Sequence, residues 1–344
     1  MSFEYESNVD LDQAAERIAD ATQVTLITHA KPDGDAFGSV AALAAAIRLA
    51  GGEVAARLMG PVSGSLETLR GMEYVKLYHD GDPLPESELL VIVDTGAYSQ
   101  VEPVREQVEA HCDQTLILDH HLSGDIEAKW RYIDSEAAAA CEIVAEVIRR
   151  IHAPALEDPT VTESLFVGLA SDTGWFRFSN TRPQTHHLAA ELLAAGVDQA
   201  DIYRRLEQAE RPEKLALIAR ALHSLDLLAD GQFAVMTLTS DDFAQTGARP
   251  EETERIIDLP QVLMGVKVAV LITESSDGGG PVRVSFRSKA VDHPVDVSAV
   301  AQSLGGGGHA RAAGAKMEGT VDEVRQRVRE AVAEAIKAAT PSSD

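Results

Sequence analysis

The chain has 344 residues, 45% of them hydrophobic, and a formal net charge of −25 at pH 7. A chain of this length is expected to form about two domains, each large enough for its own core. A polyanionic surface repels long duplex nucleic acid, which proteins bind through basic residues and counterion release. We therefore exclude long duplexes as partners and expect any phosphorylated ligand to be short, or to be attracted by metal ions and a few local cations.

The cysteine content and the hydropathy pattern bear on the compartment. Cys112 and Cys141 are too few for a disulfide framework and lack the spacing of a zinc site. The first ten residues are acidic and have neither the basic nor the apolar region of a signal peptide. No apolar run approaches the roughly 20 residues that span a bilayer. We expect a cytoplasmic protein with no membrane partner.

The first half of the chain alternates short apolar strands with helices. We expect strands at 24–27, 54–58, 74–78, 89–93 and 115–118. We expect helices at 11–21, 40–49, 103–111, 137–151, 160–170, 184–195 and 201–206. Strands and helices that alternate at these lengths predict an α/β fold with a doubly wound, mainly parallel sheet.

The second half has a different texture, with longer strands and glycine-rich connections. After a long helix at 212–229, we expect strands at 233–239, 266–273 and 282–287, helices at 297–304 and 321–338, and a glycine run at 305–308. This pattern predicts a smaller α+β domain that binds substrate. We place the first domain at 1–210, a connecting helix at 211–230 and the second domain at 231–344.

Side chains that can bind metal follow three predicted strands and one predicted helix. They are His29, Asp33, Asp35, Asp94, Asp119, His120, His121 and Asp172. Parallel strands bring their carboxyl ends to one edge of a sheet, so these groups can meet in space. Close carboxylates repel unless a cation lies between them, and His with Asp suits a first-row divalent metal. Each position alone could be a turn or N-cap residue, but the set together favours a metal site.

This ordered set resembles the motifs of the DHH-family phosphoesterases. The matching residues are the His29-x-x-x-Asp33-x-Asp35 turn, Asp94, the triplet 119–121 and Asp172. The run from Gly305 to His309, with 285–288 before it, resembles the DHH-associated domain of the same family. The resemblance covers nearly the whole chain. In length and layout the chain is most similar to the branch with nanoRNase and phosphoadenosine-phosphate phosphatase activities.

The resemblance implies two divalent metal ions, typically manganese. The implied ligands of the first ion are His29, Asp33 and Asp94. The implied ligands of the second ion are Asp35, Asp94, His120 and Asp172. Asp94 would then bridge the two ions. Charge balance supports this arrangement, because four carboxylates cancel the charge of two divalent cations. Oxygen ligands with imidazoles suit manganese better than magnesium, and zinc stays open.

Two such metals, about 3.5–4 Å apart, can share a water, lower its pKa and polarise a phosphoryl group. The expected nucleophile is therefore a bridging hydroxide. We expect Asp119 to orient a neighbouring ligand rather than to bind metal. His121 is expected to contact the phosphate as a hydrogen-bond donor or leaving-group acid; a core histidine is the alternative. Arg177 is a candidate for the substrate's charge, and its alternative is a surface salt bridge.

The second domain is expected to hold the rest of the substrate. A glycine run lets backbone N–H groups approach an anion closely, although such a run is often only a flexible turn. The candidate substrate-binding residues are Arg287, Ser288, Gly306, Gly307, Gly308, His309 and Arg311. The flanking strand and the family resemblance strengthen this interpretation.

We therefore expect a manganese-dependent phosphoesterase that hydrolyses short oligoribonucleotides and converts 3'-phosphoadenosine 5'-phosphate to AMP. The main alternative is a dinucleotide phosphodiesterase acting on cyclic di-AMP or linear pApA. An inorganic pyrophosphatase is disfavoured by the second domain, and a non-catalytic nucleotide sensor by the complete set of metal positions. The preferred substrate, the direction of degradation, the physiological metal and a homodimeric state stay open.

Overall fold

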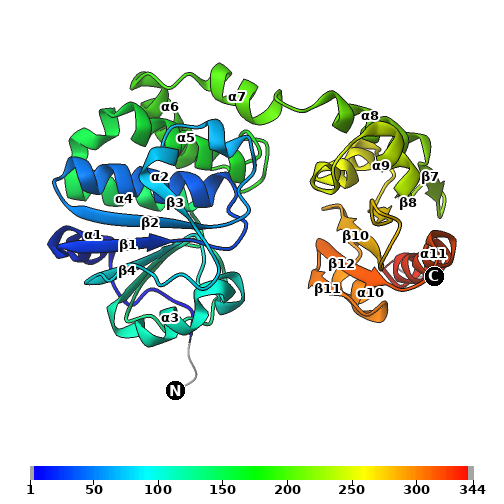
Figure 1. Cartoon of the computed structure of the whole chain (residues 1–344), viewed down its shortest axis with the longest axis horizontal. Coiled ribbons are helices and arrows are strands. Elements are labelled where there is room, and N and C mark those ends of the chain that lie inside the picture. The colour runs from blue at the N-terminus through cyan, green and yellow to red at the C-terminus, as the bar shows by residue number, and fades with distance from the viewer. Residues whose placement is uncertain (1–3, 340–344) are drawn as a thin grey trace. The chain divides into compact units, whose positions relative to one another are not determined.

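The computed structural model describes residues 4–339, which fall into two compact units that divide between Ala209 and Glu210 (Figure 1). The first unit is built on a six-stranded sheet in which all neighbouring strands run parallel. Its strands, in spatial order, are β3 (Val75–Tyr78), β2 (Glu53–Met59), β1 (Gln23–Ile27), β4 (Leu89–Val93), β5 (Thr115–Asp119) and β6 (Trp130–Ile133). The predicted parallel α/β sheet is confirmed.

Helices cover both faces of this sheet because its strands are apolar on both sides. On one face, Leu26, Val93 and Leu118 join the core that the larger helices form. The helices of that face are α1 (Leu11–Asp20), α2 (Gly34–Leu49), α4 (Ala140–His152) and α5 (Pro159–Asp172). On the other face, Ile92 and Ile117 pack with Val108 of α3 (Arg105–Ala110). Figure 1 shows α3 on the opposite side of the sheet from α2 and α5.

Two further helices complete the first unit, α6 (Pro183–Ala194) and α7 (Gln199–Glu207). Short 3-10 helices occupy its connections at Leu66–Thr68, Met72–Tyr74, Tyr98–Gln100, Glu102–Val104, Cys112–Gln114 and Ala153–Glu157. Edge strand β6 was not among the predicted strands. Each of its residues is only half-buried and it contains Arg131, so it lacks the apolar run that marks an interior strand.

Helices α2 and α5 pack unusually closely because glycines face the contact. A Cβ on Gly38 would lie 2.3 Å from the Ser164 carbonyl oxygen, and one on Gly168 would lie 2.7 Å from Asp35 Oδ1. The two helices run antiparallel, so the start of α2 lies beside the end of α5. This packing brings Asp35 and Asp172 together although they are far apart in the sequence.

The second unit is built on a mixed sheet in the order β11-β12-β10-β9-β8-β7. Its strands are β7 (Asp226–Leu228), β8 (Phe233–Leu238), β9 (Val268–Thr273), β10 (Val282–Ser288), β11 (Gly307–His309) and β12 (Ala312–Met317). Only the β8–β9 pair is parallel among these described strands. The predicted smaller α+β fold of this half is confirmed.

Both faces of the second sheet carry helices. Helices α10 (Val297–Ser303) and α11 (Val321–Ala339) pack on one face around Phe286. Helices α8 (Pro212–His223) and α9 (Ser240–Thr246), with the 3-10 helix Ile256–Val262, cover part of the other face; Pro250–Thr253 is a further 3-10 helix. Among the described residues, none of the helices has the length and apolarity that crossing a bilayer requires.

Two predicted elements of the second unit are wrong. The helix expected at 212–229, and with it the connecting helix 211–230, ends at His223. Ser224 Oγ then bonds to both the N–H and the carbonyl of Thr237, at 2.8 Å each, which draws the chain into the sheet as β7. The run 305–308 was expected to be a loop, but Gly307–His309 form strand β11 and pair with β12.

Candidate metal centre

The site lies at the topological switch point of the first sheet, between β1 and β4. The chain leaves β1 toward β2 and later returns to β4 on the other side of β1. Ligand sites of open α/β sheets form at such a switch point, outside the carboxyl ends of the strands. His29 follows β1, Asp94 follows β4, and Asp119 ends β5, which is the next strand. Three adjacent strands therefore deliver their polar ends to one place.

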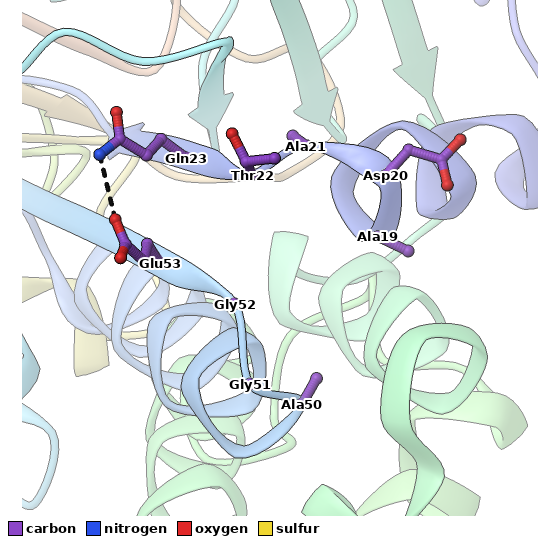
Figure 2. Close-up of a pocket in the computed structure, with 9 residues that line it drawn as sticks. All are labelled: Ala19, Asp20, Ala21, Thr22, Gln23, Ala50, Gly51, Gly52 and Glu53. Atoms are coloured by element: carbon purple, nitrogen blue, oxygen red, sulfur yellow. Dashed lines mark hydrogen bonds between the residues drawn. The ribbon is translucent and has the colours of Figure 1, made fainter.

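The opposite edge of the sheet offers different chemistry. A cavity of about 490 Å³ opens there between residues 19–23 and 50–53 (Figure 2). Its carboxylates belong to Asp20 and Glu53, and Glu53 Oε2 already accepts a hydrogen bond from Gln23 Nε2 at 3.0 Å. Histidine is missing from the residues that line this cavity, so the Asp/His chemistry belongs to the carboxyl edge.

Helix α2 delivers two of the carboxylates. Asp33 is its N-cap, and Asp33 Oδ1 accepts hydrogen bonds from the N–H groups of Asp35 and Ala36 at 3.0 and 3.1 Å. The helix thus begins at Gly34, earlier than the predicted residue 40, because the Asp33 cap satisfies its first N–H groups. Asp35 is fully buried, and its carboxylate accepts hydrogen bonds from Ala140 N at 2.5 Å and Cys141 N at 3.0 Å, at the start of α4.

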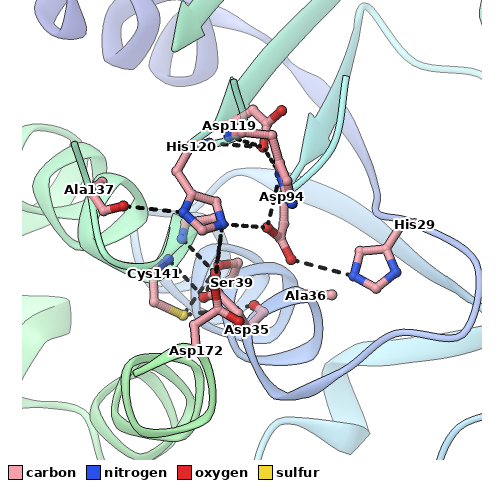
Figure 3. Close-up of polar contacts among 12 residues, drawn as sticks. His29, Asp35, Ala36, Ser39, Asp94, Asp119, His120, Ala137, Cys141 and Asp172 are labelled. Carbon is pink, nitrogen blue, oxygen red and sulfur yellow. Dashed lines mark hydrogen bonds and ion pairs between the residues drawn. The ribbon is translucent and has the colours of Figure 1, made fainter. Parts of the chain in front are cut away.

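Asp94 is the centre of the cluster (Figure 3). Its Oδ2 lies 3.4 Å from His29 Nε2, and its Oδ1 lies 3.2 Å from His120 Nε2. Asp94 is buried, and among the described residues Oδ1 has no hydrogen-bond partner. The residue has a left-handed backbone with φ of 63°, a conformation that Asp and Asn adopt more readily than most residues other than glycine. A buried carboxylate that reaches two imidazoles is typical of a functional group.

Backbone carbonyls hold both imidazoles in a ligand-like orientation. His29 Nδ1 lies 3.1 Å from the carbonyl oxygen of Ala30, and His120 Nδ1 lies 3.2 Å from that of Ala137. Each Nδ1 therefore donates to a carbonyl, and each Nε2 faces the carboxylates. His120 Nε2 also lies 3.4 Å from Asp172 Oδ2. This is the arrangement that second partners impose on metal-binding histidines.

The pKa values of this cluster reflect the repulsion between its closely spaced carboxylates. Burial disfavours a charged imidazole, but the contacts with neighbouring carboxylates raise the pKa of His29 to about 11 and that of His120 to about 10. Burial, with the charge of Asp94, raises the pKa of Asp172 to about 7 and raises that of Asp35 well above its usual value. Without metal, protons supply the positive charge that these carboxylates need.

The donor atoms fit a pair of metal ions. Among the described residues, three groups have donor atoms within 4.8 Å of one another: His29/Asp33/Asp94, Asp35/His120/Asp172 and Asp94/His120/His121. The first group has the three residues expected for one ion. The second has three of the four residues expected for the other ion and lacks Asp94. The assignment of these residues to two ions stays a prediction. Carboxylate oxygens and imidazole nitrogens suit manganese among the divalent metals. The unpartnered Oδ1 of Asp94 would gain a partner from a bound cation.

Asp119 and His121 form a pair beside the cluster, and His121 Nδ1 lies 3.8 Å from Asp94 Oδ1. Asp119 is fully buried, and Asp119 Oδ1 accepts a hydrogen bond from His121 Nδ1 at 2.7 Å. Burial alone would raise the pKa of Asp119, but hydrogen bonds from His121 and Tyr5 lower it. Because Asp119 occupies Nδ1, the His121 ring leaves Nε2 for a substrate, and the side chain is 52% exposed. This geometry agrees with the expected orienting role of Asp119.

Arg177 follows a left-handed turn after α5. Gly174, Trp175 and Phe176 have φ values of 54°, 59° and 63°, and Arg177 Nε donates to the Gly174 carbonyl at 2.6 Å. Among the described residues, no hydrogen bond or ion pair joins Arg177 to the Asp/His cluster. The sequence reasoning missed Asn180, whose Nδ2 donates to the carbonyls of Ala138 and Asp172 at 3.0 and 3.1 Å and ties α5 to the start of α4.

The candidate residues of the second unit divide between two faces of its sheet. Arg287 on β10 and His309 on β11 both pair with Ala312 of β12 and therefore point to one face. Ser288, the next residue on β10, points to the other face and is buried. The predicted grouping of Ser288 with Arg287 and His309 on one face is therefore wrong, because side chains alternate along β10.

The glycines of this unit have packing reasons of their own. A Cβ on Gly306 would lie 2.1 Å from the Gly314 carbonyl oxygen, and one on Gly308 would lie 2.6 Å from that of Ala312. Gly307 has open space around it. Arg311 lies at the turn between β11 and β12 and donates to the Lys289 carbonyl at 2.5 Å. Gly306 and Gly308 thus let β11 approach β12 closely.

The fold and the site define a class: a doubly wound parallel domain with an Asp/His cluster at its switch point, followed by a mixed-sheet domain. Residues 23–169 match the DHH family, N-terminal domain, and residues 230–338 match the DHHA1 domain. The chain belongs to the DHH family, and it is a hydrolase of the phosphoester-cleaving class. The resemblance read from the motifs is confirmed.

Curated relatives resemble the chain over most of its length. It is 30% identical over 313 residues to the bifunctional oligoribonuclease and PAP phosphatase NrnA of Thermus thermophilus, covering 90% of this chain and 89% of the relative. It is 25% identical to NrnA of Bacillus subtilis, with coverage of 86% and 89%. It is 27% identical to the cyclic-di-AMP phosphodiesterase GdpP of Geobacillus thermodenitrificans, with coverage of 92% and 48%.

Solved structures share the fold. An exopolyphosphatase-related protein from Bacteroides fragilis matches with a TM-score of 0.85 at 21% identity, covering 96% of this chain and 97% of that one. RecJ from Thermus thermophilus, solved in complex with Mn²⁺, matches with a TM-score of 0.54 at 14% identity, covering 96% of this chain and 55% of RecJ. At these identities the likeness concerns the fold alone.

Proposed function

We propose that the protein is a manganese-dependent phosphoesterase that hydrolyses short oligoribonucleotides and converts 3'-phosphoadenosine 5'-phosphate to AMP. The observation that carries the proposal is Asp94, whose two carboxylate oxygens face the Nε2 atoms of His29 and His120 at 3.4 and 3.2 Å. A carboxylate shared in this way suits two metal ions. The substrate class is taken from the similarity to the two NrnA proteins over most of the chain.

In this proposal six side chains hold two divalent ions: His29, Asp33, Asp35, Asp94, His120 and Asp172. Four carboxylates balance the charge of the two ions. Such ions, when bound, lower the pKa of a shared water and polarise the phosphoryl oxygens. The Ala30 and Ala137 carbonyls keep the two imidazoles oriented through Nδ1. Manganese is proposed because the donor set mixes oxygen with imidazole nitrogen.

His121 is assigned to the leaving group. Its Nδ1 is bonded to Asp119, so Nε2 can donate a proton to the ester oxygen as the P–O bond breaks. Asp119 holds the ring in that tautomer and supports its positive charge. Arg177, Arg287, His309 and Arg311 are proposed to contact the charge or base of the substrate.

The charge of the chain limits the length of substrate. A net charge of −25 provides no continuous basic track for a long strand, so binding depends on a few local groups. Cys112 and Cys141 are both free, which suits the reducing cytoplasm that we propose as the location.

An activity panel with added manganese tests the proposal. It compares di- to pentanucleotides and a long single strand with 3'-phosphoadenosine 5'-phosphate, cyclic di-AMP, pApA and pyrophosphate. The proposal expects turnover of the short oligonucleotides and of phosphoadenosine phosphate, and loss of that turnover when the metal is chelated. Turnover restricted to pyrophosphate, or binding without turnover, would refute it.

A cyclic or linear dinucleotide phosphodiesterase is the second candidate. It is favoured by the 27% identity to GdpP, although this chain covers only 48% of that protein. Efficient opening of cyclic di-AMP, with weak activity on tri- to pentanucleotides and on phosphoadenosine phosphate, would decide for the alternative.

A further inference from the structure

The N-terminal segment before α1 is fastened to the edge of the first sheet beside the site. Ser7 Oγ accepts a hydrogen bond from Ile133 N at 2.7 Å and donates to its carbonyl at 2.9 Å. Asn8 makes a similar pair of bonds one step further along, to Arg131 N at 2.7 Å and to the Lys129 carbonyl at 2.9 Å. These four bonds follow β6, the neighbour of β5, and so fix where the preceding residue Tyr5 enters the molecule.

Two glycines make room for the Tyr5 ring. A Cβ on Gly96 would lie 1.9 Å from the Tyr5 hydroxyl oxygen, and a Cβ on Gly124 would lie 2.5 Å from Tyr5 Cε2. Gly96 comes two residues after Asp94, and Gly124 comes three residues after His121. The carbonyl of Gly96 also accepts the N–H groups of Asp125 and Ile126, at 2.9 and 3.0 Å. The ring therefore occupies a slot between two loops of the site, and any larger residue at either glycine would fill it.

The Tyr5 hydroxyl reaches the carboxylate that orients His121. It donates to Asp119 Oδ2 at 2.5 Å, while Asp119 Oδ1 accepts from His121 Nδ1 at 2.7 Å. Among the described residues, Tyr5 is the only hydrogen-bond donor to Oδ2. Asp119 is fully buried, so without that hydroxyl one oxygen of a buried carboxylate would be left unpaired. Oδ1 would stay bonded to the backbone N–H groups of His120 and His121, at 2.8 and 3.3 Å. The carboxylate plane, however, would lose the contact that fixes its second oxygen, and with it the angle at which Oδ1 meets the His121 ring.

We propose that Tyr5 is a positioning residue for phosphoester hydrolysis, which fixes the Asp119 carboxylate so that it holds the His121 imidazole toward the leaving group. The inference rests on the proposed function in one respect, the assignment of His121 as the leaving-group acid. In that step, a water that has released one proton to solvent adds to phosphorus as hydroxide, and the electron pair of the broken P–O bond stays on the ester oxygen. This oxygen takes the proton of His121 Nε2, and His121 then regains a proton from solvent. In this proposal Tyr5 acts through Asp119, to which its hydroxyl is bonded, and not on the substrate itself.

The test uses Tyr5→Phe, which keeps the ring in its slot and removes only the hydroxyl. Its matched control is Tyr78→Phe, which removes another tyrosine hydroxyl from the same apolar core that Tyr5 packs against; the Tyr78 hydroxyl is bonded to the Pro103 carbonyl at 3.3 Å rather than to Asp119. Two manganese-supplemented substrates are compared, the methyl ester and the p-nitrophenyl ester of AMP. The methyl ester leaves as a poor alkoxide and needs a proton, whereas p-nitrophenolate leaves without one.

Tyr5→Phe should lower kcat for the methyl ester about ten-fold, a part of the hundred-fold or larger contribution of a general acid. Its kcat for the p-nitrophenyl ester, its KM for both esters and its manganese content should stay within about two-fold of the wild type, a change below about 0.5 kcal/mol. Tyr78→Phe should match the wild type on both esters. Equal losses on the two esters, no loss on either, or loss of manganese would overturn the proposal.

A double-mutant cycle guards against a folding defect. Gly96→Ala should displace the Tyr5 ring and reproduce the selective loss on the methyl ester, whereas Tyr5→Ala/Gly96→Ala should be no worse than Tyr5→Ala. Additive losses of kcat in the double variant would overturn the inference that Gly96 acts by making room for the Tyr5 ring. Failure of the proposed function would give a different result. In that case the wild-type protein would not hydrolyse dinucleotides or phosphoadenosine phosphate. The role of Tyr5 is instead judged from the ratio of variant to wild-type kcat on the two esters of AMP.

Discussion

Arg287 and His309 lie in one cross-strand row of the second sheet, on either side of Ala312. Neighbouring strands are about 4.8 Å apart, so the two side chains rise from one face at a separation of about 10 Å. The same face carries only small residues between them, Ala312 and, one row along, Gly314 and Ser285. Arg287 Nε also lies 3.6 Å from Asp258 Oδ1, a half-exposed contact that an anionic ligand would have to compete with. A guanidinium and an imidazole in one row suit an anionic or planar ligand.

His309→Ala should separate recognition from chemistry. Loss of the His309 imidazole should lower kcat/KM for a dinucleotide about ten- to a hundred-fold, because this fold-change corresponds to the free energy of one hydrogen bond to a charged group. A small chromogenic phosphoester and the manganese content should be unaffected. Arg283→Ala, a change at an exposed residue of β10 on the same face of the sheet, is the control. An equal fall on both substrates would place His309 in the catalytic machinery instead.

Asp94→Asn should be the most damaging single change in the metal centre, because this carboxylate faces both histidines. An amide has half the ligand capacity and no charge, so we expect loss of most bound manganese and essentially all turnover. The fold should survive, because Asn tolerates the left-handed backbone as Asp does. Elemental analysis and circular dichroism measure the two effects, with Asp20→Asn at the opposite edge as control. Two manganese ions retained by Asp94→Asn would contradict a shared ligand.

Substrate length should control activity steeply. With a chain charge of −25, each added phosphate brings repulsion and little new contact. We expect kcat/KM to fall from di- and trinucleotides toward a long single strand, measured at several salt concentrations. Raising the salt should narrow this difference by screening the repulsion. Equal rates on dinucleotides and long strands at moderate salt would count against the proposed substrate class.

Glu163→Gln should destabilise the first unit. Glu163 is mostly buried on α5, accepts a bond from Arg205 Nη2 at 2.8 Å, and also pairs with Arg70. Arg205 keeps its ion pair with Asp201 at 2.8 Å, so loss of the Glu163 charge removes one of its two carboxylate partners. This loss should lower the free energy of unfolding by about 1–2 kcal/mol. Both tryptophans, Trp130 and Trp175, belong to this unit, so their fluorescence in urea reports on it alone. Glu109→Gln, in an exposed pair with Arg105, should leave the midpoint unchanged.

The sequence alone determined the features that depend on local pattern. Apolar runs such as 89–93 marked the interior strands, and the alternation with helices implied that they are parallel. Parallel strands share one carboxyl edge, so the positions of the Asp and His residues after these strands were enough to assign them to one site. The sequence allowed Asp33 to be either a metal ligand or an N-cap residue, and its side chain does cap α2. These inferences need only neighbours in the chain and the geometry of one sheet.

Only the tertiary structure decided what depends on pairing between distant segments. Tyr5 donates a hydrogen bond to Asp119, which lies 114 positions later in the chain. From the sequence, the segment that contains Tyr5 shows only an acidic composition. The Ala137 carbonyl that orients His120 belongs to another element and has no side-chain signal. Register placed Arg287 with His309 and turned Ser288 to the opposite face, because side chains alternate along a strand. Packing and strand register determine which distant residues contact one another, and neither can be recognised from local composition.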